Sequence, residues 1–156
     1  MKKILLASAH HWTSPFRVGG HHIAKAFTNM GYKVGHISAP ISPLHLLGGM
    51  TKILYDRWLL YVNGGVEVEK DIWAYVPGAL LTPNIHVILK TYWLHRNWYR
   101  LSFPSLVGKI KQKGFDSIDI LYLDNSIHYC LLDLIDYKKC IFRIADYNKG
   151  FSNITK

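Results

Sequence analysis

The residues best suited to chemistry lie between the first expected strand and the first expected helix. Gly19 and Gly20 stand where that helix should begin. Glycines there let a ligand approach the backbone N–H groups, which together with the helix dipole favour an anion such as phosphate. Arg17 would add positive charge, and His21 or His22 would add a donor or a proton carrier. The competing interpretation is that the glycines only allow the chain to turn.

This loop differs from two other kinds of site. It lacks Gly-x-Gly-x-x-Gly and is too long for that tight turn, which counts against a nicotinamide or flavin dehydrogenase. The pairs His10-His11 and His21-His22 suggest zinc, but neighbouring residues on a helix point in different directions. The sequence has no Cys pair and no His-Glu-x-x-His pattern to support a metal. We therefore expect no metal and no cofactor.

A second candidate pair lies further along the chain. Asp124 and His128 are four residues apart across the expected start of a helix. This spacing can bring a carboxylate near an imidazole, a pair able to deprotonate an acceptor hydroxyl. The alternative is a simple helix cap by Asp124 or Asn125, with His128 facing solvent. Asp146 follows the last expected strand, as either a loop carboxylate or a cleft residue.

The elements that would position these residues alternate between strand and helix. The alternation predicts a Rossmann-like parallel α/β sheet of about five strands, in the order 3-2-1-4-5, with helices on both faces. In such a sheet ligands bind beyond the carboxyl ends of the strands, near the switch point. The expected strands are 2–8, 32–38, 73–76 at the end of an extended stretch from 66, 118–123 and 140–145. The expected helices are 21–30, 51–62, 85–101, one after Pro104, and 127–135.

The composition of the chain indicates which classes of partner it could bind. The chain has 156 residues and a formal charge of +9, which fits one globular domain with anionic partners. Basic and aromatic residues alternate between Lys90 and Arg100, as on a solvated helix face or a membrane or substrate surface. We expect Cys130 and Cys140 to be buried free thiols. With no signal peptide and no apolar run of membrane-spanning length, we expect a cytoplasmic protein, with peripheral contact to the inner face of the plasma membrane left open.

The ordered set of motifs resembles the N-terminal domain of bacterial GT-B glycosyltransferases that build cell-surface polysaccharides, of the teichuronic-acid type. The resemblance implies an acceptor-side Rossmann-like domain at 1–146, a polar tail at 147–156, and a C-terminal donor-binding domain that this sequence lacks. An edge strand would then be uncovered. The resembling segments are residues 19–27, 30–34, 38–45, 73–77, 120–124 and 142–147.

The same resemblance implies transfer of a sugar from a nucleotide-sugar donor to a lipid-linked or polysaccharide acceptor, without a metal. Gly19 and Gly20 would approach the donor diphosphate. The candidates for orienting or deprotonating the acceptor are His21, His22, Asp124 and His128. We expect weak or absent turnover by this chain alone, since half of the transition-state contacts would be missing. The other expected substrate-binding residues are Arg17, His21, His22 and Asp146.

Two further interpretations remain open at this point. A basic α/β module could bind nucleic acid through its phosphate backbone, with affinity that falls steeply with salt. No nucleic-acid-binding signature supports it, and we expect no nucleic-acid partner. The chain could also be a non-catalytic half that associates with a partner domain.

Overall fold

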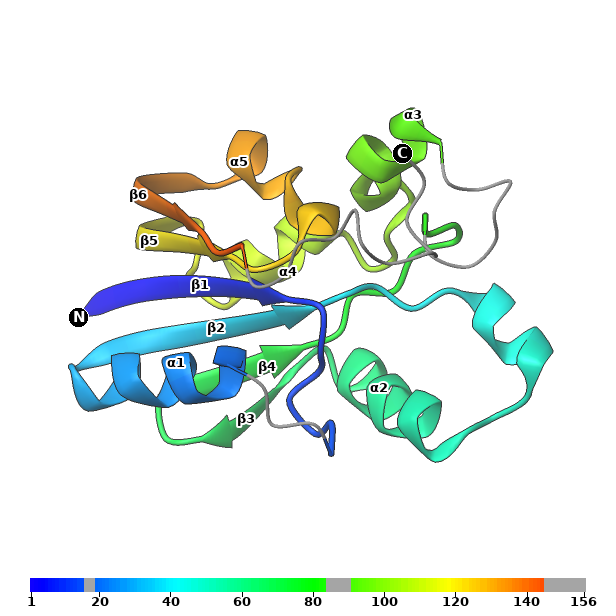
Figure 1. Ribbon diagram of the computed structural model, residues 1–156, viewed down its shortest axis with the longest axis horizontal. Coiled ribbons are helices and arrows are strands. Elements are labelled where there is room, and N and C mark those ends of the chain that lie inside the picture. The colour runs from blue at the N-terminus through cyan, green and yellow to red at the C-terminus, as the bar shows by residue number, and fades with distance from the viewer. Residues whose placement is uncertain (16–18, 84–90, 145–156) are drawn as a thin grey trace.

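The structure, a computed structural model, describes residues 1–15, 19–83 and 91–144. These residues form a sheet of six strands in the order β3-β4-β2-β1-β5-β6 (Figure 1). Neighbouring strands are parallel except β3 and β4, which are antiparallel. The strands are β1 (Lys2–Ser8), β2 (Tyr32–Ser38), β3 (Val66–Glu69), β4 (Ile72–Tyr75), β5 (Ser117–Leu123) and β6 (Asp136–Phe142).

Helices connect the strands, and several begin at side-chain caps that the sequence provides. Thr51, Thr91 and Ser105 each accept a hydrogen bond from a backbone amide three residues further on. Gly31, with φ +81°, follows the first helix at the expected position. The helices are α1 (Gly19–Asn29), α2 (Lys52–Val62), α3 (Tyr92–Asn97), α4 (Leu106–Gln112) and α5 (Leu131–Leu134), with the 3₁₀ turns η1 (Pro43–Gly48), η3 (Trp98–Leu101) and η4 (Ser126–His128).

The predicted fold class is confirmed. The predicted order 3-2-1-4-5 corresponds to β4-β2-β1-β5-β6, and β3 is an additional antiparallel edge strand. The extended segment from 66 to 76 folds back on itself between β3 and β4, where Asp71 adopts a positive φ of 62°. Sequence periodicity showed one extended stretch and did not locate this turn.

Several element boundaries were predicted wrongly. The helix expected at 85–101 has Thr91 as the cap of α3 instead, while residues 84–90 lie outside the described part. The helix expected at 127–135 is split into η4 and α5, and the last strand then starts at Asp136 and not at Cys140. Lys138 pairs with Asp119 across β5 and β6, with 2.7 Å between Nζ and Oδ1. A strand stabilised by such polar contacts does not show the apolar run that sequence analysis detects.

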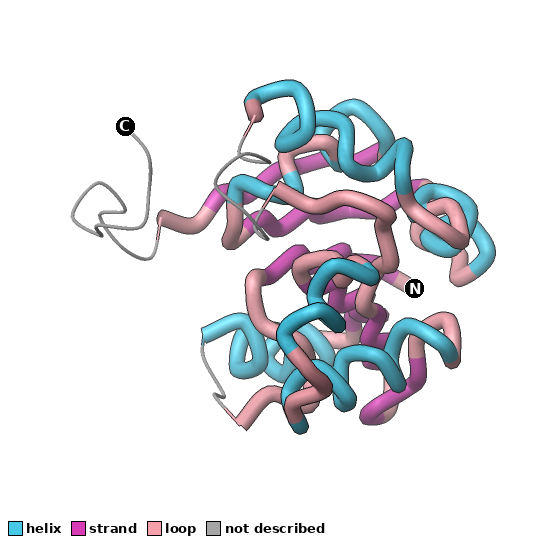
Figure 2. The backbone as a smooth tube through the Cα atoms, turned by 90° about the vertical axis from the view of Figure 1, so that its right-hand side faces the viewer, coloured by secondary structure: helices cyan, strands magenta, loops and turns pink. Residues whose placement is uncertain are grey.

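Two hydrophobic layers hold the sheet, one on each face. Ile4 and Leu6 of β1 pack with Ala24 of α1, whereas Leu5 and the α4 residue Ile110 belong to the core on the opposite face. This alternation follows from the two-residue period of a strand. Seen toward the carboxyl ends of the strands, helices lie on both sides of the sheet (Figure 2). A third, smaller core joins α2 to the segments that follow β2 and β4.

The cysteines differ in environment. Cys130 is buried and free, and burial raises the pKa of its thiol to about 12. Cys140 is free but exposed, so the expectation that both thiols are buried was wrong for it. It belongs to β6, whose residues are exposed along the edge of the sheet.

Two glycines with positive φ allow a matched test of the packing. Gly65 (φ +84°) lies against the Trp73 indole, which a Cβ would overlap, whereas Gly31 (φ +81°) has open space. We expect Gly65→Ala to lower the free energy of unfolding by about 2–4 kcal/mol, from backbone strain plus overpacking. Gly31→Ala should cost about 1 kcal/mol, from the positive φ alone. Urea unfolding of both variants checks this, and equal losses would contradict the packing at Gly65.

Candidate functional site

The candidate site lies where the chain order of the sheet reverses, between the carboxyl ends of β1 and β5. Ser8 is the last residue of β1, and Asp124 directly follows β5. The Ser8 hydroxyl donates to Asp124 Oδ2 at 3.4 Å, and the Asp124 amide donates to the Ala7 carbonyl at 3.0 Å. Asp124 is therefore held above the end of β1, at the position where open α/β sheets bind ligands.

The start of α1 faces this carboxylate. A Cβ on Gly20 would lie 3.3 Å from Ser8 Oγ and 3.5 Å from Asp124 Oδ2. A Cβ on Gly19 would overlap the guanidinium of Arg143. The pair of glycines thus lets a carboxylate and a guanidinium come close to the first turn of the helix. A side chain at either position would intrude on these two charged groups.

Arg143 is the residue of this site that sequence analysis did not select. Its amide donates to the Leu123 carbonyl at 2.8 Å, which places it directly after β6 on the same rim as Asp124. The end of a helix that carries its free N–H groups is electropositive, so a guanidinium beside it is unfavourable unless an anion lies between them. Arg143 was missed because the last strand was expected to continue to residue 145, which put this arginine inside a strand.

The electrostatics of Asp124 suit a proton acceptor. Burial raises the pKa of Asp124, while the Arg143 guanidinium and the Ser8 hydroxyl oppose that shift. A carboxylate with a raised pKa is a stronger base, and the neighbouring cation favours its ionised form. Tyr122, on β5, also contacts Arg143, and burial raises the pKa of its phenol.

His21 and His22 point in different directions, as expected for neighbours on a helix. His21 is buried, with Nε2 3.0 Å from the Trp12 carbonyl oxygen. Its ring centroid lies 4.9 Å from that of Trp12 and 5.6 Å from that of His36. His22 is exposed. Of the two histidines, His22 is the one placed to meet a ligand from solvent.

The structure does not join Asp124 and His128 by a hydrogen bond. Asn125 provides the cap, its side chain accepting from the Ile127 amide at 2.9 Å. His128 does not face solvent, as the cap interpretation supposed; it is fully buried, 6.4 Å from the Trp98 ring in an edge-on arrangement. Burial lowers the pKa of His128 to about 4, although a backbone hydrogen bond at Ser38 opposes the shift. His128 therefore contributes a neutral ring beneath the rim.

Two predicted substrate-binding residues and the predicted absence of a metal remain to be compared with the structure. Arg17 and Asp146 lie outside the described residues. Within residues 1–15, 19–83 and 91–144, no group of three or more His, Cys, Asp or Glu side chains could hold a metal ion. The expectation of a metal-independent reaction stays a prediction.

A doubly wound, mostly parallel sheet with helices on both faces, and with a carboxylate, an arginine and two glycines at its switch point, is a Rossmann-like domain. Residues 6–148 match the family described as the N-terminal domain of the glucuronosyltransferase GumK. The chain belongs to this family of glycosyltransferase N-terminal domains, in agreement with the resemblance drawn from its motifs. No curated protein and no solved structure matches the chain.

Proposed function

We propose that this domain takes part in transfer of a sugar from a nucleotide-sugar donor to a hydroxyl of a lipid-linked or polysaccharide acceptor. The observation that carries the proposal is the convergence of Asp124, Arg143 and the start of α1 at the switch point. It supplies a base for the acceptor hydroxyl and positive charge for a diphosphate within one rim. Family membership points to the same chemistry.

In this proposal Arg143 and the first amides of α1 receive the donor diphosphate. Gly19 and Gly20 keep the helix start narrow, so that a phosphate oxygen can approach the N–H groups and the guanidinium together. The matched family is named for glucuronosyl transfer. A uronate donor carries a carboxylate in addition to its phosphates, which suits a chain with a formal charge of +9.

Catalysis in this proposal needs a second, donor-binding domain of the GT-B type facing the rim. The described residues supply a base and part of a diphosphate site, while a nucleotide and a sugar need further contacts. We therefore expect the isolated chain to bind the donor weakly and to turn it over slowly or not at all.

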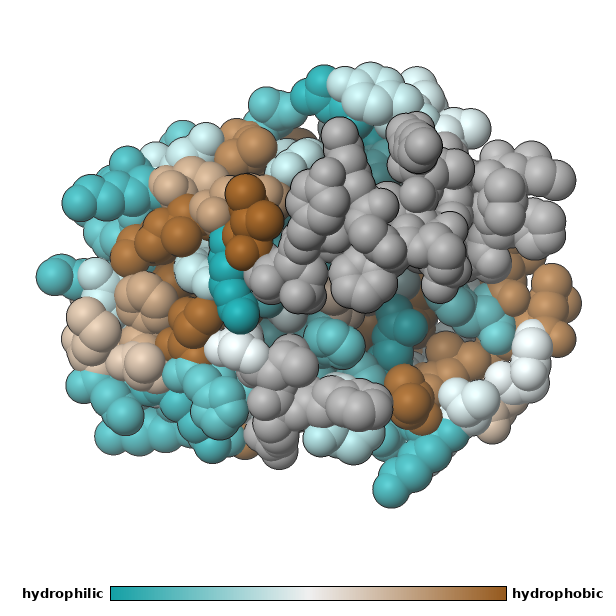
Figure 3. Space-filling model, in the orientation of Figure 1, coloured by the Kyte–Doolittle hydropathy of each residue, from teal (hydrophilic) through white to brown (hydrophobic). Residues whose placement is uncertain are grey.

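A lipid-linked acceptor would require the domain to contact a membrane surface. Among the described residues, no helix is long and apolar enough to cross a bilayer. The end of the molecule formed by η1 and the first part of α2 nevertheless carries hydrophobic side chains on its surface (Figure 3). Such a surface is suited to the interface of a membrane on the cytoplasmic side. Its exposed apolar residues are Leu46, Leu47, Met50, Ile53 and Tyr55.

Arg143→Gln should weaken binding of a nucleoside diphosphate by about 10- to 100-fold, since a charge-assisted hydrogen bond is worth about 1.5–3 kcal/mol. Isothermal titration of the purified chain with the nucleoside diphosphate measures this. The matched control is Arg96→Gln, which removes an exposed arginine of α3 that pairs with Asp133. Equal affinity of Arg143→Gln and the unaltered chain would exclude Arg143 from the donor site.

A further inference from the structure

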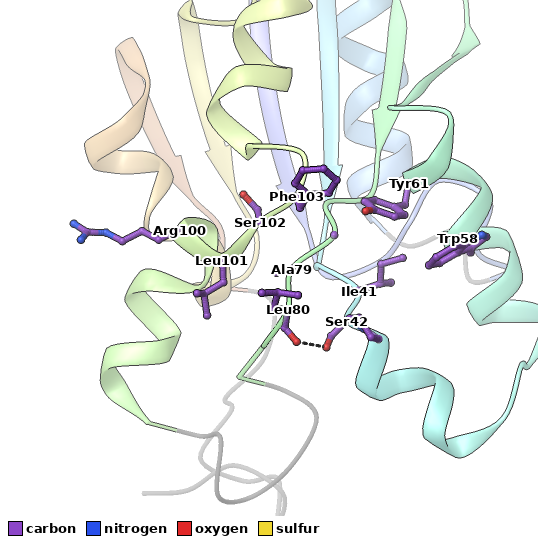
Figure 4. Close-up of a pocket in the computed structure, with 12 residues that line it drawn as sticks. Ile41, Ser42, Trp58, Tyr61, Ala79, Leu80, Arg100, Leu101, Ser102 and Phe103 are labelled. Atoms are coloured by element: carbon purple, nitrogen blue, oxygen red, sulfur yellow. Dashed lines mark hydrogen bonds between the residues drawn. The ribbon is translucent and has the colours of Figure 1, made fainter.

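A cavity lies beyond the ends of β2 and β4, and what we infer from it rests on the proposed function. Its volume is about 490 Å³, within the range of roughly 300–1,000 Å³ that ligand sites occupy. Four segments form it: the start of η1, one face of α2, the stretch after β4, and η3 with the residues that follow (Figure 4). The cavity is distinct from the rim that holds Asp124 and Arg143, none of whose residues lines it.

The walls of the cavity are apolar. Trp58 and Tyr61 of α2 form one side, with ring centroids 5.4 Å apart. The two serine hydroxyls of the lining already have partners: Ser42 Oγ donates to the Leu80 carbonyl at 2.7 Å, and Ser102 Oγ donates to the Tyr99 carbonyl at 2.5 Å. The remaining polar side-chain groups of the lining are the Tyr61 hydroxyl, the Trp58 indole N–H and the Arg100 guanidinium. These are few for a sugar ring, which needs many donors and acceptors, whereas a hydrocarbon chain needs none.

Two large apolar side chains at the cavity are exposed to solvent. Phe103 is 76% exposed and Leu80 is 62% exposed, although both line it. Covering them with an apolar ligand would remove hydrophobic surface from water, which favours binding. The cavity also begins at Ser42 and Pro43, where η1 starts. It is therefore continuous in the chain with the hydrophobic surface of η1 and α2.

One charged residue, Arg100, is among the twelve that line the cavity. Its guanidinium extends outward from one end of the lining (Figure 4). Its Nε donates to the Tyr99 hydroxyl at 3.2 Å, which directs the side chain. A ligand whose chain fills the cavity and whose phosphate emerges at this end would place its negative charge near Arg100.

We propose that this cavity holds the first hydrocarbon segment of the lipid that carries the acceptor, with Arg100 meeting its phosphate. The domain would thus bind the acceptor by its lipid, beside the rim where its sugar hydroxyl reacts. The apolar walls favour a hydrocarbon chain, and Arg100 favours a ligand with a negatively charged end.

Titration of the purified chain with farnesyl phosphate, followed by tryptophan fluorescence, tests the proposal. We expect saturable binding of farnesyl phosphate, and binding at least 10-fold weaker for farnesol and for inorganic phosphate. Leu101→Trp, which fills the cavity, should weaken farnesyl phosphate binding at least 10-fold. Arg100→Gln should remove the preference for farnesyl phosphate over farnesol, and the matched control Arg96→Gln should retain it.

Three results would overturn the proposal: no saturable binding of farnesyl phosphate, equal binding of farnesyl phosphate and inorganic phosphate, or unchanged affinity in both Leu101→Trp and Arg100→Gln. Thermal unfolding followed by circular dichroism shows whether each variant is folded. If Leu101→Trp does not fold, Arg100→Gln still tests the proposal, because its side chain is exposed. Titration with a nucleoside diphosphate separates this proposal from the function above. If the protein binds the nucleoside diphosphate through Arg143 but does not bind farnesyl phosphate, the proposed donor site is supported and the proposed lipid site is overturned.

Discussion

Replacing Asp124 by asparagine should lower the rate of glycosyl transfer by about 10²- to 10⁴-fold, the usual contribution of a general base. Asparagine has nearly the same shape and can still accept the hydrogen bond from Ser8, so the fold should be unaffected. What it loses is the ability to take the proton of the acceptor hydroxyl. The rate is measured with this domain combined with a donor-binding domain of its family, because we expect the chain alone to turn over slowly.

The pH profile separates a base from a merely structural carboxylate. Since burial raises the pKa of Asp124, the rate of the unaltered protein should rise with pH through a pKa that is higher than the usual value for an aspartate. The rise should be absent in Asp124→Asn. The control is Asp119→Asn, a carboxylate of β5 that pairs with Lys138 and lies away from the rim. Full activity in Asp124→Asn would exclude this residue as the base.

Acidification from pH 8 to pH 5 should lower the free energy of unfolding by about 2 kcal/mol for each of the fully buried histidines His36 and His128, and by less for His11, whose charge solvent screens in part. Burial lowers the pKa of His36 to about 3, and burial is also the largest cause that lowers those of His11 and His128 to about 4. These values lie below the value of about 6.5 expected in the unfolded chain. The unfolded state therefore binds more protons below pH 6.5, and stability falls as the pH decreases toward the folded pKa values.

Urea unfolding at pH 8, 7, 6 and 5 measures this loss. His128→Phe keeps an aromatic ring against Trp98 and removes the titrating group, so its stability should fall by about 2 kcal/mol less over the same range. Asp119 also makes the protein less stable as the pH falls, but over a lower pH range than the histidines. The reason is that the Lys138 ammonium lowers the pKa of the Asp119 carboxyl below its usual value. A pH dependence unchanged by His128→Phe would contradict the burial of this histidine.

The strand order and the rim were predictable from the sequence because both follow from local patterns. Apolar runs give the strands, glycines and prolines mark their ends, and a parallel sheet brings those ends together. Gly19 and Asp124 were selected in this way, and the structure brings the start of α1 close to Asp124. Their roles in binding and proton transfer stay predictions.

Contacts between distant segments were not predictable. Trp98 Nε1 donates to the Ile127 carbonyl at 2.7 Å, which fixes η4 against η3 across 29 residues of sequence. This contact places His128 inside the protein, whereas a local cap would have left it at the surface. Arg143 was not selected from the sequence because the last strand was expected to end at residue 145, whereas β6 ends at Phe142. The cavity that we propose for the lipid had no sequence signal, since its walls come from four separate segments.

The most direct test of the central claim is a ¹H–¹⁵N correlation spectrum of the purified chain during titration with a nucleoside diphosphate. The structure predicts that the amides of Gly19 and Gly20 and the side chain of Arg143 shift together, with one affinity. Shifts confined to other residues, with these three signals unchanged, would contradict an anion site at the start of α1 and the proposed role of the domain in sugar transfer.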